Sequence, residues 1–164
     1  DELGVLKMPN NYTDLAQYAM DLGYPGLTQR VLEEAFARNI YTDQRTKDRN
    51  QRLLVGAQKR TVGDKAQLPQ AARQAASSPN GDAYVGVGGG YLSYGEYPQA
   101  VEALQKGIAK GGLKYPDEAN LLLGIAQFRA KNLPEARKAF EKVAQSRSPA
   151  YARLGALWAI HARG

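Results

Sequence analysis

Four of the five positions from Gly86 to Gly90 are glycine, a density that raises the question of a phosphate-binding loop. A dinucleotide fingerprint needs G-x-G-x-x-G between a strand and a helix, and a P-loop needs G-x-x-x-x-G-K-[ST]. Tyr91 stands where the last glycine of the first pattern belongs, and no Gly-Lys-Ser or Gly-Lys-Thr follows. The preceding segment 77–82 reads SSPNGD, which is typical of a turn. We therefore do not expect a nucleotide site here.

The sequence has few other residues of the types that act in catalysis or bind metals. The 164 residues contain no cysteine and a single histidine, His161, which excludes disulfides, thiolate metal sites and multi-histidine sites. No carboxylate lies within a helical turn of His161, so we expect it to be structural or solvated. The carboxylates Glu33, Glu34, Asp117 and Glu118 fall at expected helix surfaces or caps. We therefore predict no catalytic site, cofactor or metal, and we do not expect an enzyme.

A recurring pattern of small and aromatic residues indicates which elements position these side chains. Its clearest copy consists of Tyr84, Val87, Gly88, Tyr91, Gly95, Tyr97, Ala100, Leu104 and Gly107. A second copy contains Leu123, Gly124, Leu133, Ala136, Phe140 and Val143, and Gly124 follows Gly88 by 36 residues. In this copy Asn120, Gln127 and Lys131 replace the first aromatic, the tyrosine and the turn glycine. The pattern resembles the tetratricopeptide repeat, a helix–turn–helix unit of about 34 residues.

The resemblance implies an all-α fold in which helix–turn–helix repeats stack in a right-handed superhelix, an α-α solenoid. We predict a single repeat domain over 1–164, with about nine helices. The expected units are 9–40, 43–77, 81–115, 117–147 and a closing helix 148–163. The unit 43–77 is degenerate, with Gly63 at its turn. Because the chain begins at Asp1 rather than Met, we expect it to be part of a longer protein.

The glycines acquire structural roles in this fold. Gly88 and Gly124 are expected where two helices touch, and Gly95 is expected to end a helix in the left-handed conformation. Gly86, Gly89 and Gly90 have no such role in the repeat. Either they form a weak helix that its neighbours hold in place, or they let a ligand backbone approach closely.

The family also implies which residues face the concave groove, because the first helix of each pair lines it. These are Thr13, Gln17, Met20, Leu53, Ala57, Arg60, Val85, Gly89, Leu92, Leu121, Ile125 and Phe128, and Arg129 lies beside them. The strip is apolar and carries few charges. We predict that Phe128 anchors a bound peptide; the alternative is that Phe128 is core, buried by a neighbouring helix.

We therefore predict a protein-interaction scaffold that binds a peptide or protein partner in this groove. The alternative is a structural or oligomerisation module of an envelope-associated assembly, which would associate through the terminal helix with Leu154, Leu157, Trp158 and Ile160. Helix pairs such as AMDLGYPGLTQRVLEEAFARNI resemble bacterial tetratricopeptide proteins of unassigned role, many of them exported. Localisation stays open between the periplasm or envelope and the cytoplasm.

Charge gives a further indication of the partner. The formal net charge is +6, and basic residues gather between Tyr41 and Lys65 and between Arg129 and Arg163. Such runs are usually solvated helix faces, and otherwise they suit an acidic peptide or an anionic surface. No aromatic residues interleave with them as a nucleic-acid stacking platform requires, so nucleic acid is not expected. No stretch is long and apolar enough to predict a membrane span.

Overall fold

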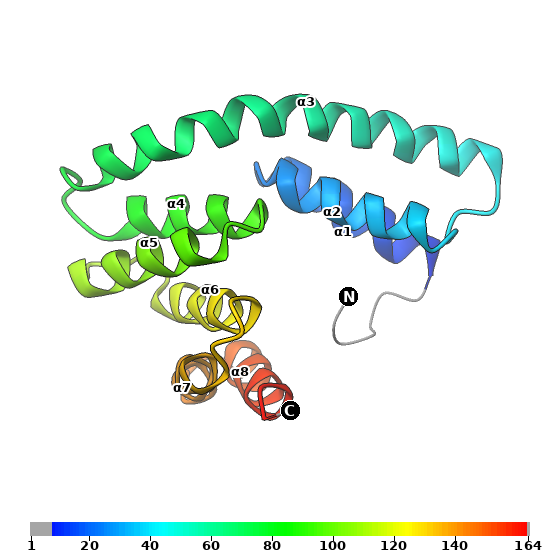
Figure 1. The fold of residues 1–164 in the computed structure, drawn as a ribbon. Helices are drawn as coiled ribbons and strands as arrows, with labels where there is room; N and C mark the ends of the chain where they lie inside the picture. Colours follow the sequence, from blue (N-terminus) through cyan, green and yellow to red (C-terminus); the bar gives the residue numbers. More distant parts are fainter. Residues whose placement is uncertain (1–7, 164) are drawn as a thin grey trace. The chain divides into compact units, whose positions relative to one another are not determined.

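The computed structural model describes residues 8–163, and every regular element in that range is an α-helix (Figure 1). The all-α prediction is thus confirmed for the described residues. The helices are α1 (Pro9–Asp21), α2 (Pro25–Ala37), α3 (Gln44–Ala75), α4 (Asp82–Ser93), α5 (Tyr97–Lys110), α6 (Pro116–Arg129), α7 (Leu133–Ala144) and α8 (Pro149–His161).

Proline and glycine set many of the helix boundaries. α1, α2, α5, α6, α7 and α8 each carry proline in the first two positions, where its missing N–H has no intrahelical partner to lose. α2, for example, begins at Pro25 itself. Gly95 has a φ of 76°, so the predicted left-handed turn between α4 and α5 is confirmed.

The predicted helix pair over 43–77 is wrong, because the single helix α3 runs through 32 residues of that range. Gly63, the expected turn residue, lies inside α3. A glycine costs a helix only about 1 kcal/mol relative to alanine, so it cannot end a segment that is otherwise rich in Lys, Gln, Arg and Ala. For this reason residues 8–163 contain eight helices, where about nine were expected for the chain.

The chain forms two compact units, Asp1–Ala66 and Gln67–Gly164, and their boundary lies within α3. The first unit contains α1, α2 and the first part of α3. Its core includes Tyr12, Leu32 and Leu54, all less than 8% exposed. Asn50 is fully buried, and its side-chain amide donates hydrogen bonds to the Thr13 hydroxyl and the Thr46 carbonyl, each at 3.0 Å.

In the second unit, successive helices pack against one another from α4 to α8 (Figure 1). A Cβ atom added at Gly88 would lie 2.5 Å from Cγ of Leu104, so only glycine lets α4 approach α5 this closely. A Cβ atom at Gly124 would lie within 3.0 Å of three ring atoms of Phe140 on α7. Leu104 and Phe140 are also 36 residues apart, so the same contact recurs in two helix pairs. The predicted packing roles of both glycines are confirmed.

The other glycines of the 86–90 cluster differ among themselves. Gly89 is buried, and a Cβ atom at Gly90 would lie 2.7 Å from Cδ2 of Leu68 near the end of α3. The atom that a Cβ at Gly90 would meet is the flexible end of the Leu68 side chain, so this contact does not by itself require a glycine. Gly86 is exposed, with nothing within 4 Å of an added Cβ atom.

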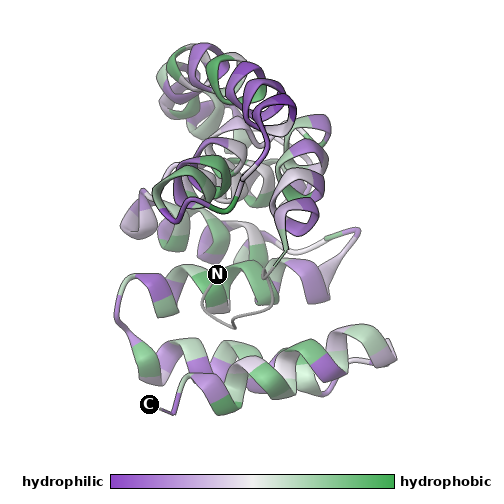
Figure 2. Ribbon diagram, turned by 90° about the vertical axis from the view of Figure 1, so that its right-hand side faces the viewer, coloured by the Kyte–Doolittle hydropathy of each residue, from purple (hydrophilic) through white to green (hydrophobic). Residues whose placement is uncertain are grey.

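The closing helix α8 has a different register from the one its sequence indicates. Leu154–Gly155 resembles the Leu123–Gly124 pair, but Gly155 contacts the helix before it, α7, with an added Cβ atom 2.7 Å from the Phe140 carbonyl oxygen. Gly124 instead contacts the helix that follows it. Figure 2 shows hydrophobic residues along α8, which ends beside the C label. None of the helices in residues 8–163 is long and apolar enough to cross a membrane.

Candidate functional site

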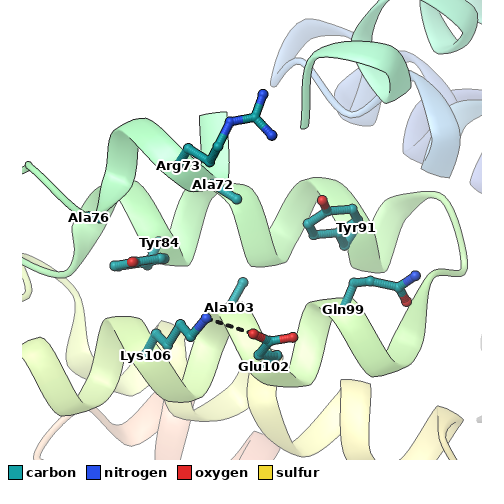
Figure 3. A pocket seen from close by; sticks show the side chains of 9 residues that line it. All are labelled: Ala72, Arg73, Ala76, Tyr84, Tyr91, Gln99, Glu102, Ala103 and Lys106. Atoms are coloured by element: carbon teal, nitrogen blue, oxygen red, sulfur yellow. Dashed lines mark hydrogen bonds and ion pairs between the residues drawn. The ribbon is translucent and has the colours of Figure 1, made fainter. Parts of the chain in front are cut away.

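An open cleft in the second unit lies between the end of α3 and the helices α4 and α5 (Figure 3). Its volume is about 400 Å³. We call it the first cleft. Its lining residues are Ala72, Arg73, Ala76, Tyr84, Tyr91, Gln99, Glu102, Ala103 and Lys106.

Two tyrosines from α4 give the first cleft its aromatic wall. Tyr84 and Tyr91 are both half-buried and lie seven residues apart, on one face of the helix. The ammonium of Lys110 lies 5.7 Å from the ring centroid of Tyr84. The same ammonium donates hydrogen bonds to the carbonyls of Ala75 at 3.2 Å and Ala76 at 2.7 Å, where α3 ends. A cation is thus fixed at the edge of an aromatic surface.

The polar wall comes from α5. Lys106 donates a 2.6 Å hydrogen bond to Glu102, one turn away, and both side chains are solvent-exposed (Figure 3). This hydrogen bond and the attraction between the charges lower the pKa of the Glu102 carboxyl and raise the pKa of Lys106. Both groups therefore stay charged at neutral pH, and Gln99 adds an amide to the same wall. Aromatic rings, an amide and paired charges suit binding of a polypeptide segment.

A second cleft of about 300 Å³ repeats the first one along the chain. Its lining residues are Gln105, Ile108, Asn120, Leu123, Gln127, Glu135, Lys138, Ala139 and Lys142. Seven of the nine residues lie 36 positions after a residue that lines the first cleft. The equivalent pairs are Ala72 and Ile108, Tyr84 and Asn120, Tyr91 and Gln127, Gln99 and Glu135, Glu102 and Lys138, Ala103 and Ala139, and Lys106 and Lys142.

The two clefts share a position in the repeat but differ in chemistry. Amides from Asn120 and Gln127 replace the two tyrosines, and Lys138 replaces the carboxylate Glu102. The second cleft is therefore less aromatic. Its lining has the same charges as that of the first cleft, two cations and one carboxylate, because Glu135 replaces Gln99. Within the described residues, no group of three or more His, Cys, Asp or Glu side chains could hold a metal ion.

The predicted groove residues of the first unit do not form one open surface. Thr13 and Ala57 are buried, which contradicts the exposure expected of groove residues. Gln17 is half-buried and donates a 2.9 Å hydrogen bond to Asp21 on its own helix. Met20 lies against α3, with its methyl 3.8 Å from a Cβ atom built at Gly56.

Two further candidates of the first unit lie on α3. Leu53 packs against the core of that unit and is half-buried, whereas Arg60 is exposed. Neither residue lines either of the two clefts.

On α4, the predicted groove residues are largely unavailable to a ligand. Gly89 is buried, and Leu92 is 8% exposed within the core that α4, α5 and α6 share. The expectation that these two positions are exposed is wrong, because α5 and α6 cover Leu92. Val85 is half-buried and packs against the same core.

On α6, Leu121, Ile125, Phe128 and Arg129 are all half-buried. The first three pack against the core cluster formed with α7 and α8. The Phe128 ring centroid lies 5.7 Å from that of Trp158 and 5.1 Å from that of His161.

These ring contacts favour the alternative in which Phe128 belongs to the core. They also give His161 a structural neighbourhood of aromatic rings. Trp158 stacks on Phe140 as well, with centroids 5.3 Å apart, so α8 is fastened to both α6 and α7 by aromatic contacts.

The lining of the first cleft was not predicted as a site. Tyr84 and Tyr91 fit the packing slots of the repeat, and Gln99, Glu102 and Lys106 fit a solvated helix face. A tyrosine that packs on one side and faces a cleft on the other has the same helical spacing as a core residue. The signal that could have indicated the cleft is the pairing of these five positions with their counterparts 36 residues later.

No protein-family model matches this chain, and neither a curated protein nor a solved structure matches it. The resemblance to the tetratricopeptide family therefore rests on the residues quoted above and stays a prediction.

Proposed function

We propose that the chain is a protein-interaction scaffold of the tetratricopeptide type, in which the repeats stack in a right-handed superhelix. The proposed ligand is a segment of a partner protein, and the proposed binding surface is the pair of clefts in the second unit. This is a binding role rather than a catalytic one. Gly89 and Leu92 were predicted to line the concave groove, but both are buried. We therefore place the binding surface in the two clefts rather than in that groove.

The recurrence of the cleft carries this proposal. Two clefts at equivalent repeat positions, lined by different side chains, would let one polypeptide segment place a different residue in each. Tyrosine suits such a surface because it offers a large contact area at a low cost in side-chain entropy. Tyrosine is also enriched among the residues that dominate binding energy in protein interfaces.

The charges of the first cleft favour an acidic segment. Arg73 and Lys106 line it and Lys110 lies at the Tyr84 ring, whereas Glu102, its one lining carboxylate, is already paired with Lys106. An acidic ligand would gain from this imbalance, and its affinity should fall as salt screens the attraction.

The experiment is selection of displayed random peptides on the immobilised 164-residue chain, followed by affinity measurement of individual peptides by fluorescence anisotropy. Tyr84→Asn gives the first cleft the residue found in the second, and Asn120→Tyr makes the reverse exchange. We expect Tyr84→Asn to weaken selected peptides by about tenfold. The matched control is Tyr18→Asn, because Tyr18 is an exposed helical tyrosine of the first unit.

Peptides that bind the wild-type chain but ignore exchanges in both clefts would contradict the cleft as the binding surface. Leu121→Ser and Val85→Ser would then test the half-buried remainder of the predicted groove. A chain that selects no peptide above background would contradict the scaffold proposal itself.

A further inference from the structure

Gln127 on α6 carries a buried amide that has no partner within the part of the chain that the structure describes. The residue is 5% exposed, and its side chain forms no hydrogen bond there. The Thr28 hydroxyl, by comparison, is fully buried and donates a 3.0 Å hydrogen bond to the Ala16 carbonyl. The buried Ser93 hydroxyl donates to the Gly90 carbonyl at 2.8 Å. A buried amide without a partner lowers the stability of a fold, so Gln127 needs an explanation other than packing.

The position of Gln127 provides that explanation, because the residue lines the second cleft. Its counterpart in the first cleft is Tyr91, 36 residues earlier (Figure 3). Asn120 lies seven residues before Gln127 on the same face of α6 and lines the same cleft. One N–H of Asn120 donates to the Pro116 carbonyl at 2.7 Å, which leaves its side-chain oxygen and its second N–H for another partner. The second cleft thus presents two side-chain amides to one space.

The openness of the second cleft is a property of the repeat. The first cleft is followed along the chain by α6, α7 and α8, and these helices leave it open. The second cleft lies between equivalent elements, one repeat later, and α8 is the helix that follows it. A further helix in the same register would therefore leave the second cleft open as well.

The chemistry of the Gln127 side chain restricts the kind of ligand. A carboxamide offers both N–H donors and a C=O acceptor, whereas a carboxylate offers only acceptors and an ammonium or guanidinium only donors. The polypeptide backbone offers both kinds of group. In an extended segment the N–H and C=O of one residue point to the same side and can pair with one partner group. In a helix these groups are already bonded within the helix. The ligand that satisfies Gln127 best is therefore an extended backbone.

We propose that the second cleft binds the backbone of an extended segment of the partner protein. The Gln127 amide pairs with the N–H and C=O of one ligand residue, and Asn120 contacts a neighbouring part of the same backbone. This inference rests on the proposed binding of a partner segment in the clefts, and it adds how the segment is held. The tyrosines of the first cleft contact ligand side chains, whereas the amides of the second cleft fix the conformation and register of the ligand.

The test uses the 164-residue chain and the tightest peptide from the display selection described above. The peptide is synthesised as a series of analogues, each with one backbone amide replaced by an ester. An ester removes one N–H donor and leaves every side chain unchanged. Fluorescence anisotropy measures the affinity of the parent peptide and of each analogue for the wild-type chain and for Gln127→Met.

We expect one ester position to weaken binding to the wild-type chain by about fivefold to tenfold, because it removes the N–H that pairs with Gln127. Gln127→Met should weaken the parent peptide by about tenfold. In Gln127→Met the same ester should cost nothing further, which is the result expected of two groups that contact each other. Gln70→Met is the matched control, because Gln70 is an exposed glutamine of α3 that lines neither cleft, and it should bind as the wild type does.

The chain without peptide provides an independent measurement. Methionine is close to glutamine in length and volume but has no polar group that needs a partner. We expect Gln127→Met to raise the melting temperature by about 2–4 °C, because it removes the unpaired amide. Gln70→Met should leave the melting temperature unchanged. Circular dichroism of each variant verifies that the helices are intact.

Three results would overturn the proposal. The first is a lower melting temperature for Gln127→Met, which would mean that the amide is paired within the protein. The second is a set of ester losses that stays the same in Gln127→Met, since the lost N–H would then contact another residue. The third is a series in which every ester analogue binds as the parent does and only an acidic or amide side chain of the peptide matters. Under the last two results the chain still binds peptides, so the scaffold proposal stands; a chain that selects no peptide contradicts both.

Discussion

At the scale of single residues, Lys131 adopts a backbone conformation that suits glycine. Its φ is 64°, in the turn between α6 and α7, and Gly95, 36 residues earlier, has a φ of 76° in the turn between α4 and α5. A side chain at such a position costs about 1–2 kcal/mol. We expect Lys131→Gly to raise the free energy of unfolding by about 0.5–1 kcal/mol, measured by urea denaturation. Ala130→Gly, at a neighbouring residue with a φ of −74°, should not stabilise the chain.

Gly124 presents the opposite case, because a side chain there has no room. Phe140, the residue that a Cβ atom would meet, is fully buried and cannot move aside without disturbing the core. We expect Gly124→Ala to lower the melting temperature, with a loss of about 1–3 kcal/mol. The control is Gly86→Ala on α4, which meets nothing within 4 Å and should stabilise by about 0.5–1 kcal/mol. Equal effects of the two substitutions would contradict the contact.

Phe128 tests the aromatic cluster that fastens α8. Truncation to alanine removes ring contacts with Trp158 and His161, from a side chain that is half-buried. We expect Phe128→Ala to cost about 1–3 kcal/mol, less than for a fully buried phenylalanine. Thermal melts followed by tryptophan fluorescence measure this loss and report on Trp158, the single tryptophan. An unchanged melting temperature would contradict the core role of Phe128 and favour the prediction that it lines the groove.

At the scale of elements, the sequence predicts the helix pairs well where glycine and proline have steric consequences. Gly95 and the paired contacts of Gly88 and Gly124 follow from the repeat pattern, because a missing Cβ atom has a direct effect on packing. The pattern fails at Gly63, whose presence in a helix is tolerated. The repeat pattern also fails to predict the clefts. Helical spacing is the same for a tyrosine that only packs in the core and for one that, like Tyr84, also lines a cleft.

The middle of α3 provides a prediction about dynamics. Between Gln58 and Gln67, only Thr61 is even half-buried, and Gly63 lies in the same stretch. Helices of this kind gain little from packing, so local opening should have a low free energy. We expect amides 58–67 to exchange with solvent deuterium faster than those of α5 or α7, measured by mass spectrometry. Gly63→Ala should slow that exchange, and protection equal to that of α5 in the wild-type chain would contradict this account.

At the scale of the whole molecule, each compact unit has a hydrophobic core of its own. Leu32 belongs to the core of the first unit and Leu104 to that of the second, and both are fully buried. Leu→Ala at such a site costs about 2–5 kcal/mol. Because a core is the cooperative unit of unfolding, we expect two calorimetric transitions. Leu32→Ala should lower one midpoint and Leu104→Ala the other, each by about 10 °C or more. If both variants shift one common transition by equal amounts, the units unfold together, and the boundary within α3 has no thermodynamic counterpart.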